Sequence, residues 1–143
     1  MSIVCKILVY TSDLKFSERI KEIFAEKDYI VKTTELFTEV VEILYFELYD
    51  ILVIEPGFIG DLSELLKLAD NIFLGIPIVV ACNENKLRIE DGNNSRFYFI
   101  NKFANPEEWR NVIQIAVDEN YKKAEKFCKG FYLSKSSIRL PFI

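Results

Sequence analysis

The stretch KILVYTSD, residues 6–13, decides the fold. Its first five residues are the end of a short run of β-branched and other apolar residues, 2–10 (SIVCKILVY), which is typical of a buried strand. Directly after this run, Ser12 or Asp13 can cap a helix over residues 14–27. A buried strand followed at once by an amphipathic helix predicts the first half of a βαβ unit.

The same alternation repeats along the rest of the chain. Further strands are predicted at residues 29–33, 51–54, 76–81 and 96–100, and further helices at 34–48, 62–68 and 106–128. Between the last two strands, residues 83–95 (NENKLRIEDGNNS) favour only a short or irregular fourth helix. Five alternating strands predict an α/β fold, a doubly wound parallel sheet of the flavodoxin-like order 2-1-3-4-5.

Size and composition predict one domain with an ordinary hydrophobic core, since half of the 143 residues are apolar. We expect the domain to span residues 1–129, because Gly130 can end the last helix. Residues 130–143 then form a C-terminal tail rich in apolar residues. Because such a tail is costly to leave in water, we expect it to pack on its own domain or on a partner, with a homodimer as the simplest case.

Several classes of site and location are excluded or disfavoured by residue content. The chain has no His, which excludes Cys/His zinc sites and Ser-His or Cys-His nucleophile pairs. Its three cysteines lie far apart without a CxxC motif, which indicates free thiols in a reducing compartment. The longest apolar stretch, residues 73–82, is too short to span a membrane, and the N-terminus has no leader features. We therefore expect a cytoplasmic protein without membrane insertion.

The net charge of −4 is unevenly distributed. Residues 121–143 carry six basic side chains against Glu125, a charge of +5, so the preceding 120 residues carry −9. Such an acidic body argues against nucleic-acid binding. We interpret the basic end as a solvated helix terminus that complements the helix dipole.

Candidate functional residues follow the strand ends. Ligands of doubly wound sheets bind beyond the carboxyl ends of the strands, at the switch point between the first and third strands. The residues at those places are Thr11, Ser12, Asp13, Glu55, Ala81, Cys82 and Lys102.

In these residues and their flanks the chain resembles the receiver domains of two-component response regulators, the CheY-like family. Residues 6–10 (KILVY) stand where the family has KILVV before its acidic pair, and residues 50–55 (DILVIE) stand for DLVLLD. Residues 98–103 (YFINKF), followed by 106–108 (PEE), correspond to the YLTKPF…EEL signature. The resemblance covers roughly residues 4–122.

The departures from this pattern fall on the residues that carry the family's chemistry. The replacements are Thr11 and Ser12 for the acidic pair that holds Mg²⁺, Glu55 for the phosphoacceptor Asp, Ala81 or Cys82 for the conserved hydroxyl residue, and Phe103 for the Pro after the lysine. Lys102 keeps its identity. The chain is thus identified as a degenerate member, a pseudo-receiver.

Loss of the acidic pair weakens the case for metal-dependent phosphoryl transfer. Mg²⁺ requires an octahedron of hard oxygens with carboxylates among them, and only Asp13 and Glu55 are weak candidates. We expect Asp13 to cap the helix instead, no bound Mg²⁺ or other cofactor, and no enzymatic activity. For Glu55, whose carboxylate lies one methylene further out, two hypotheses remain open. In the first hypothesis, Glu55 forms an ion pair with Lys102 that imitates a phosphoryl group. In the second, the Glu55–Lys102 pair is an ion pair at a polar rim without a switching role.

The resemblance also implies a partner face. In the family, an aromatic residue near the end of the last strand changes rotamer on activation, and the surface around it binds partners. Phe99 stands at that position beside Tyr98, and Trp109 lies early in the last helix. Simple core packing is the alternative for Phe99, and Trp109 belongs either to the core or to the interface.

The function these features favour is a stand-alone, phosphorylation-independent module that binds a signalling protein of unknown identity in two-component-type signal transduction. The stand-alone character is expected because no output domain follows residue 143. One alternative is a response regulator that still accepts a phosphoryl group on Glu55, Asp13 or Ser12. Another is an anion or cofactor site at Thr11 and Ser12, at a helix N-terminus.

Overall fold

The computed structural model describes residues 4–57, 67, 75–83 and 97–134. Its strands and helices are β1 (Cys5–Tyr10), α1 (Leu14–Ile23), β2 (Tyr29–Thr34), α2 (Phe37–Phe46), β3 (Ile51–Ile54), β4 (Ile78–Cys82), β5 (Phe97–Asn101) and α4 (Pro106–Ser134). Three parts of the predictions lie outside the described residues. They are the predicted helix at 62–68, apart from residue 67, the segment 84–96 and the chain after residue 134.

The five strands form one parallel sheet in the order β2-β1-β3-β4-β5. This confirms the doubly wound, flavodoxin-like prediction. β3 and β4 are buried along their whole length, as expected for central strands that are covered on both faces. Their near-continuous apolar sequences follow from that burial.

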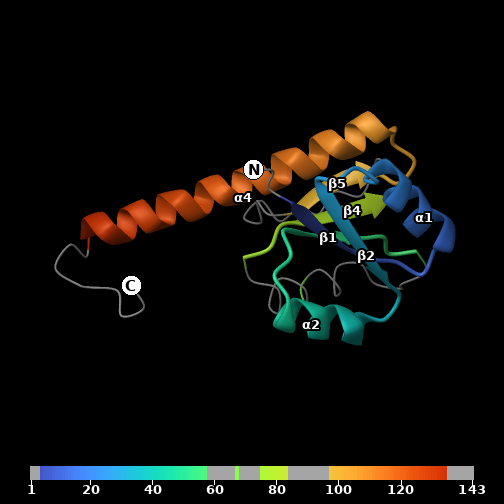
Figure 1. Ribbon diagram of the computed structural model, residues 1–143, viewed down its shortest axis with the longest axis horizontal. Helices are drawn as coiled ribbons and strands as arrows, with labels where there is room; N and C mark the ends of the chain where they lie inside the picture. Colours follow the sequence, from blue (N-terminus) through green and yellow to red (C-terminus); the bar gives the residue numbers. More distant parts are fainter. Residues whose placement is uncertain (1–3, 58–66, 68–74, 84–96, 135–143) are drawn as a thin grey trace.

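Helices cover both faces of the sheet (Figure 1). On one face, α1 and the first half of α4 form a core cluster with the sheet that includes Phe16, Ile20 and Trp109. On the other face, Val40 and Ile43 of α2 pack on Leu8, Leu52 and neighbouring strand residues. In Figure 1 the sheet lies between α4 and α2. Because all five strands are parallel, their carboxyl ends lie at the same edge of the sheet.

The start of α2 differs from the predicted range, which began at residue 34. Thr34 is the last residue of β2 and pairs with Tyr10, and the N-cap is Leu36, which makes no side-chain cap. The Thr34 hydroxyl nevertheless accepts a hydrogen bond from the Leu36 N–H at 3.3 Å and donates one to Glu39 at 2.8 Å. Thr34 thus extends the strand and supports the turn to the helix at the same time.

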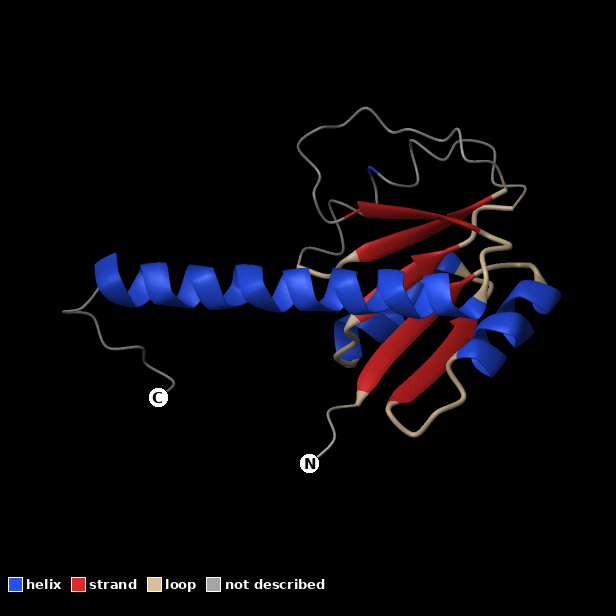
Figure 2. Cartoon of the chain, turned by 90° about the horizontal axis from the view of Figure 1, so that it is seen from above, coloured by secondary structure: helices blue, strands red, loops and turns tan. Residues whose placement is uncertain are grey.

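The last helix is longer than predicted. It begins at Pro106, but it continues through Gly130 to Ser134, so it crosses the boundary expected at residue 129. Figure 2 shows its C-terminal half extending beyond the sheet. Within the part of the chain that the structure describes, no helix is long and apolar enough to cross a membrane.

Candidate functional site

Three strand ends bring the predicted site residues together. Thr11 follows β1, Glu55 follows β3 and Lys102 follows β5. Parallel strands end at the same edge of the sheet, so these side chains converge there although they lie more than 40 residues apart. The structure therefore brings Glu55, Lys102, Asp13 and Thr11 together in one cluster.

The Glu55 carboxylate is the centre of this cluster. Its Oε1 accepts a hydrogen bond from the Thr11 hydroxyl at 2.7 Å. Its Oε2 accepts from the Gly57 backbone N–H at 2.9 Å and from the Lys102 ammonium at 3.4 Å. The side chain is only 2% exposed, so these partners replace the water that an ionised carboxylate would otherwise need.

Lys102 joins Glu55 to Asp13. Its Nζ lies 2.6 Å from Asp13 Oδ2 and 3.4 Å from Glu55 Oε2, and its side chain is 12% exposed. The rings of Phe16 and Phe103 lie 5.9 and 5.7 Å from the same nitrogen, within cation–π range. Burial acts to lower the pKa of Lys102, but the hydrogen bond to Asp13 and the charge of Glu55 outweigh it and raise that pKa above its ordinary value. Lys102 is therefore a fixed cation.

Asp13 has two roles in the structure. Its Oδ1 accepts hydrogen bonds from the backbone N–H groups of Lys15 and Phe16, which makes it the N-cap of α1, as predicted. Its Oδ2 accepts from Lys102. The Lys102 hydrogen bond is the main cause that lowers the pKa of Asp13, although partial burial opposes it. The capping carboxylate also fixes the lysine.

The Asp13–Lys102 pair predicts a pH-dependent contribution to stability. Since the pKa of Asp13 is lower in the folded chain than in the unfolded one, the contribution is complete above the unfolded pKa of about 3.9 and is lost as the pH falls through the folded value. Asp13→Asn keeps a good N-cap and removes the charge. We expect this variant to lower the free energy of unfolding by up to about 1 kcal/mol at neutral pH, a small effect because the Asp13 carboxylate is a third exposed. Near pH 3 we expect a smaller loss, because the Asp13 carboxylate of the wild type is then partly protonated.

Urea unfolding at pH 7 and pH 3 measures this difference. Glu18→Gln, on an exposed position of α1, controls for loss of a carboxylate. If Asp13→Asn lowers the free energy of unfolding equally at the two pH values, the ion pair contributes nothing.

The remaining predicted site residues lie outside this network. Ser12 is exposed, next to the cluster. Cys82 is buried in the core cluster on the α2 side of the sheet, and its thiol donates to the Val80 carbonyl at 3.7 Å. Ala81 is buried in the opposite cluster. Neither residue supplies a hydroxyl at the position where the resemblance placed one. The Cys82 carbonyl accepts a hydrogen bond from the Lys102 N–H.

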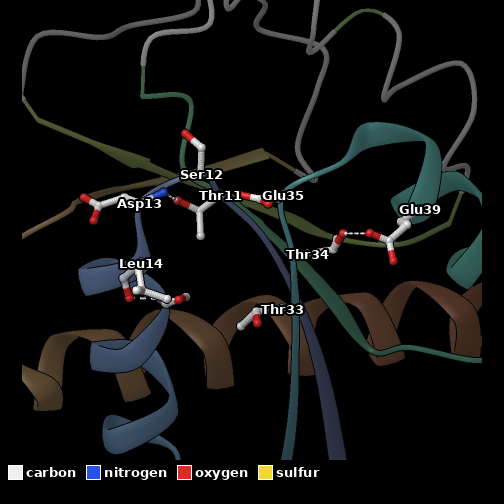
Figure 3. Close-up of a pocket in the computed structure, with 9 residues that line it drawn as sticks. Thr11, Ser12, Asp13, Leu14, Thr33, Thr34, Glu35 and Glu39 are labelled. Atoms are coloured by element: carbon white, nitrogen blue, oxygen red, sulfur yellow. Dashed lines mark hydrogen bonds between the residues drawn. The ribbon is translucent and has the colours of Figure 1, made fainter.

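A polar pocket of about 320 Å³ lies beside the network, between the start of α1 and the end of β2 (Figure 3). Hydroxyl groups of Ser12 and Thr33 and carboxylates of Glu35 and Glu39 line it. No Lys or Arg is among its described lining residues. The Lys15 and Phe16 N–H groups at the start of α1 are already bonded to Asp13. The described lining residues therefore offer no positive side chain to attract the anion that one prediction placed at Thr11 and Ser12.

The donor set does not fit Mg²⁺. The ion prefers an octahedral shell of oxygens with carboxylates in it, whereas both oxygens of Glu55 and of Asp13 already accept hydrogen bonds, and the Lys102 ammonium lies between the two groups. Among the described residues, no three acidic or Cys side chains are grouped so that they could hold a metal ion.

The three residues of the predicted partner face have different environments. Phe99, in β5, is 37% exposed. Tyr98 is half-buried, and its hydroxyl donates to Glu119 of α4 at 2.9 Å; burial and this bond raise the pKa of Tyr98 to about 12. Trp109 is fully buried, with its ring 5.7 Å from that of Phe16. Trp109 therefore belongs to the core and not to a partner face.

One contributor was missed at the level of sequence, the backbone N–H of Gly57. The turn at residues 55–57 was visible in Glu-Pro-Gly, and Gly57 has a positive φ of 53° that favours glycine. This turn folds the Gly57 N–H back onto the Glu55 carboxylate. The turn signal was therefore also a signal for the site.

Comparisons with known proteins support the fold. No family model matches the sequence, and no curated protein matches it. Among solved structures, the signal receiver domain of an HD domain-containing protein from Pseudomonas fluorescens Pf-5 superposes with a TM-score of 0.73 at 14% identity, covering 87% of this chain and 95% of that one. A CheY-like receiver domain protein from Methanospirillum hungatei JF-1 gives 0.68 at 20% identity, covering 84% and 98%.

The longer protein NtrX from Brucella abortus also superposes, with a TM-score of 0.78 at 12% identity over 93% of this chain and 30% of that chain. The similarities to the first two structures span almost the whole of the receiver domains concerned. The chain therefore has the fold of response-regulator receiver domains.

Proposed function

We propose that this protein is a receiver-type signalling module that acts by binding a protein partner, without being phosphorylated and without catalysing a reaction. The receiver fold supports a role in two-component-type signal transduction. The observation that carries the proposal is the buried Glu55 carboxylate, which accepts hydrogen bonds from Thr11, Gly57 and Lys102.

A buried carboxylate that is held by three hydrogen bonds is a poor phosphoacceptor. An attacking oxygen needs an open approach to the phosphorus, and the donor phosphate needs a divalent ion to neutralise it. Glu55 is 2% exposed, and its bonding partners hold both oxygens in place. The residues around it do not fit Mg²⁺ either, so phosphoryl transfer to this carboxylate is not supported.

The same contacts favour the hypothesis that Glu55 imitates a phosphoryl group. A rim ion pair would be open to water, whereas the Glu55 side chain is 2% exposed and that of Lys102 is 12% exposed. Glu55 offers a negative charge to Lys102 and to the Thr11 hydroxyl without any modification. The strand-end cluster is then fixed in one state, and Phe99, partly exposed on β5, remains on the surface that we assign to a partner.

Amide NMR titration tests the proposal, first with Mg²⁺ and then with Mg²⁺ and beryllofluoride, which imitates an acyl phosphate. We expect no saturable shifts at Thr11, Asp13, Glu55 and Lys102, because these groups already satisfy one another. A phosphorylatable receiver domain with an Asp at the acceptor position, titrated in parallel, controls for the reagent.

Saturable shifts at these residues that extend to Phe99 would show that the phosphorylation switch survives, and the proposal would be wrong. Glu55→Gln provides the complementary variant. It removes the charge that we assign to signalling, so its amide spectrum is expected to change at Lys102 and Thr11 even without any ligand.

A further inference from the structure

The C-terminal half of α4 leaves the domain. The last described side-chain contacts between this helix and the sheet region are those of Glu119 with Tyr98 and of Tyr121 with Asp50, both at 2.9 Å. Helix α4 then continues over residues 122–134, a length of about 20 Å. In Figures 1 and 2 no other described element runs beside this part of the helix.

The extension gains little stability from its own sequence. It continues a helix that is already formed, so it needs no new nucleation, but Gly130 costs about 1 kcal/mol relative to Ala in a helix interior. The sequence of residues 122–134, KKAEKFCKGFYLS, also contains four large apolar residues. These facts indicate that another surface covers the extension.

Charge identifies the kind of surface. Residues 120–134 contain Lys122, Lys123, Lys126 and Lys129 against Glu125, a net charge of +3. The first half of the same helix, residues 106–119, has the opposite sign, because Glu107, Glu108, Asp118 and Glu119 outnumber Arg110 for a net charge of −3. All five side chains of this first half are exposed.

We propose that the extension docks on a second copy of this chain, with the two α4 helices antiparallel. In this arrangement the basic half of each helix lies against the acidic half of the other, and the two contacts are equivalent, as in an isologous dimer. A parallel pair would place the lysines of both copies together and repel. The inference does not depend on the state of Glu55.

Sedimentation velocity of the full chain and of two charge-reversal variants tests this arrangement. One variant reverses the extension (K122E/K123E/K126E/K129E), and the other reverses exposed acids of the first half (E107K/D118K). We expect the wild type to be dimeric. Each variant is expected to raise the dissociation constant about tenfold or more, because like charges then face each other. The two sets combined in one chain are expected to restore the dimer.

Glu35→Lys with Glu42→Lys is the matched control. It makes the same kind of charge change at exposed positions on the α2 side of the sheet and is expected to leave the dimer intact. Circular dichroism shows whether each variant folds. If the four-residue reversal does not fold, the neutral K122Q/K123Q/K126Q/K129Q variant takes its place, with weaker dimerisation expected.

Three outcomes would overturn the proposal. A wild type that stays monomeric would assign the extension to a different acidic partner. A dimer that both variants leave unchanged would place the contact elsewhere. Loss of the dimer in both variants without recovery in the combined one would exclude reciprocal pairing of the two halves.

Discussion

Replacing Lys102 by Met lowers the free energy of unfolding by about 3 kcal/mol, the largest effect we expect from any polar residue of the site. Glu55 is 2% exposed and Lys102 12% exposed, so the pair is close to fully buried. Removing one member of a buried ion pair leaves the other charge without compensation, which typically costs about 3–5 kcal/mol. We expect the lower end of that range, because Thr11 and Gly57 still donate to Glu55.

A double-mutant cycle with Glu55→Gln isolates the interaction. Gln has nearly the same shape and no charge, so the uncompensated charge is absent from the K102M/E55Q double variant. We expect the double variant to be clearly more stable than K102M alone, with a coupling energy of about 2 kcal/mol. Lys21→Met, an exposed position on α1, is the control and is expected to change stability by less than about 0.5 kcal/mol.

Chemical denaturation followed by circular dichroism gives all four corners of this cycle. If the loss of free energy in K102M/E55Q equals the sum of the losses in K102M and in E55Q, then the two side chains are not coupled, and the ion pair is a rim contact after all. That result would remove the physical basis for a site held in one state by Glu55.

The sheet and the strand-end cluster were predictable because both follow from local patterns. Each strand is a short apolar run, and five such runs separated by amphipathic segments favour one parallel order. In a parallel sheet the residues after each strand meet at one edge. Thr11, Glu55 and Lys102 could therefore be placed together without knowing any side-chain geometry.

Other features were not predictable from local patterns. Gly130 is a common helix terminator, yet its cost of about 1 kcal/mol in a helix interior does not end α4, which continues to Ser134. The Glu-Pro-Gly sequence predicts a turn, but it does not reveal that the Gly57 N–H bonds to the Glu55 carboxylate. Whether Trp109 faces the core or a partner depends on where α1 lies against α4.

Trp109→Ala is expected to lower the free energy of unfolding by about 3–5 kcal/mol, the cost of removing a large aromatic side chain from a packed core. The indole is 0% exposed and lies against Phe16, within the cluster formed by α1, α4 and the sheet. The cavity left by Ala would lie where these three elements meet, so neighbouring side chains cannot fill it without moving a helix.

Trp109→Phe separates packing from the polar group of the same side chain. The indole Nε1 is buried and has no hydrogen-bond acceptor among the described residues. Phe keeps most of the ring contact with Phe16 and removes the unpaired donor, so part of the lost burial is offset and the expected cost is well below that of Ala.

Urea unfolding followed by circular dichroism compares the variants. Trp109 is the single Trp of the chain, so a red shift of the wild-type emission on unfolding reports its burial directly. If Trp109→Ala costs less than about 1 kcal/mol and the native emission is already that of an exposed indole, Trp109 lies at a surface and returns to the candidate partner face.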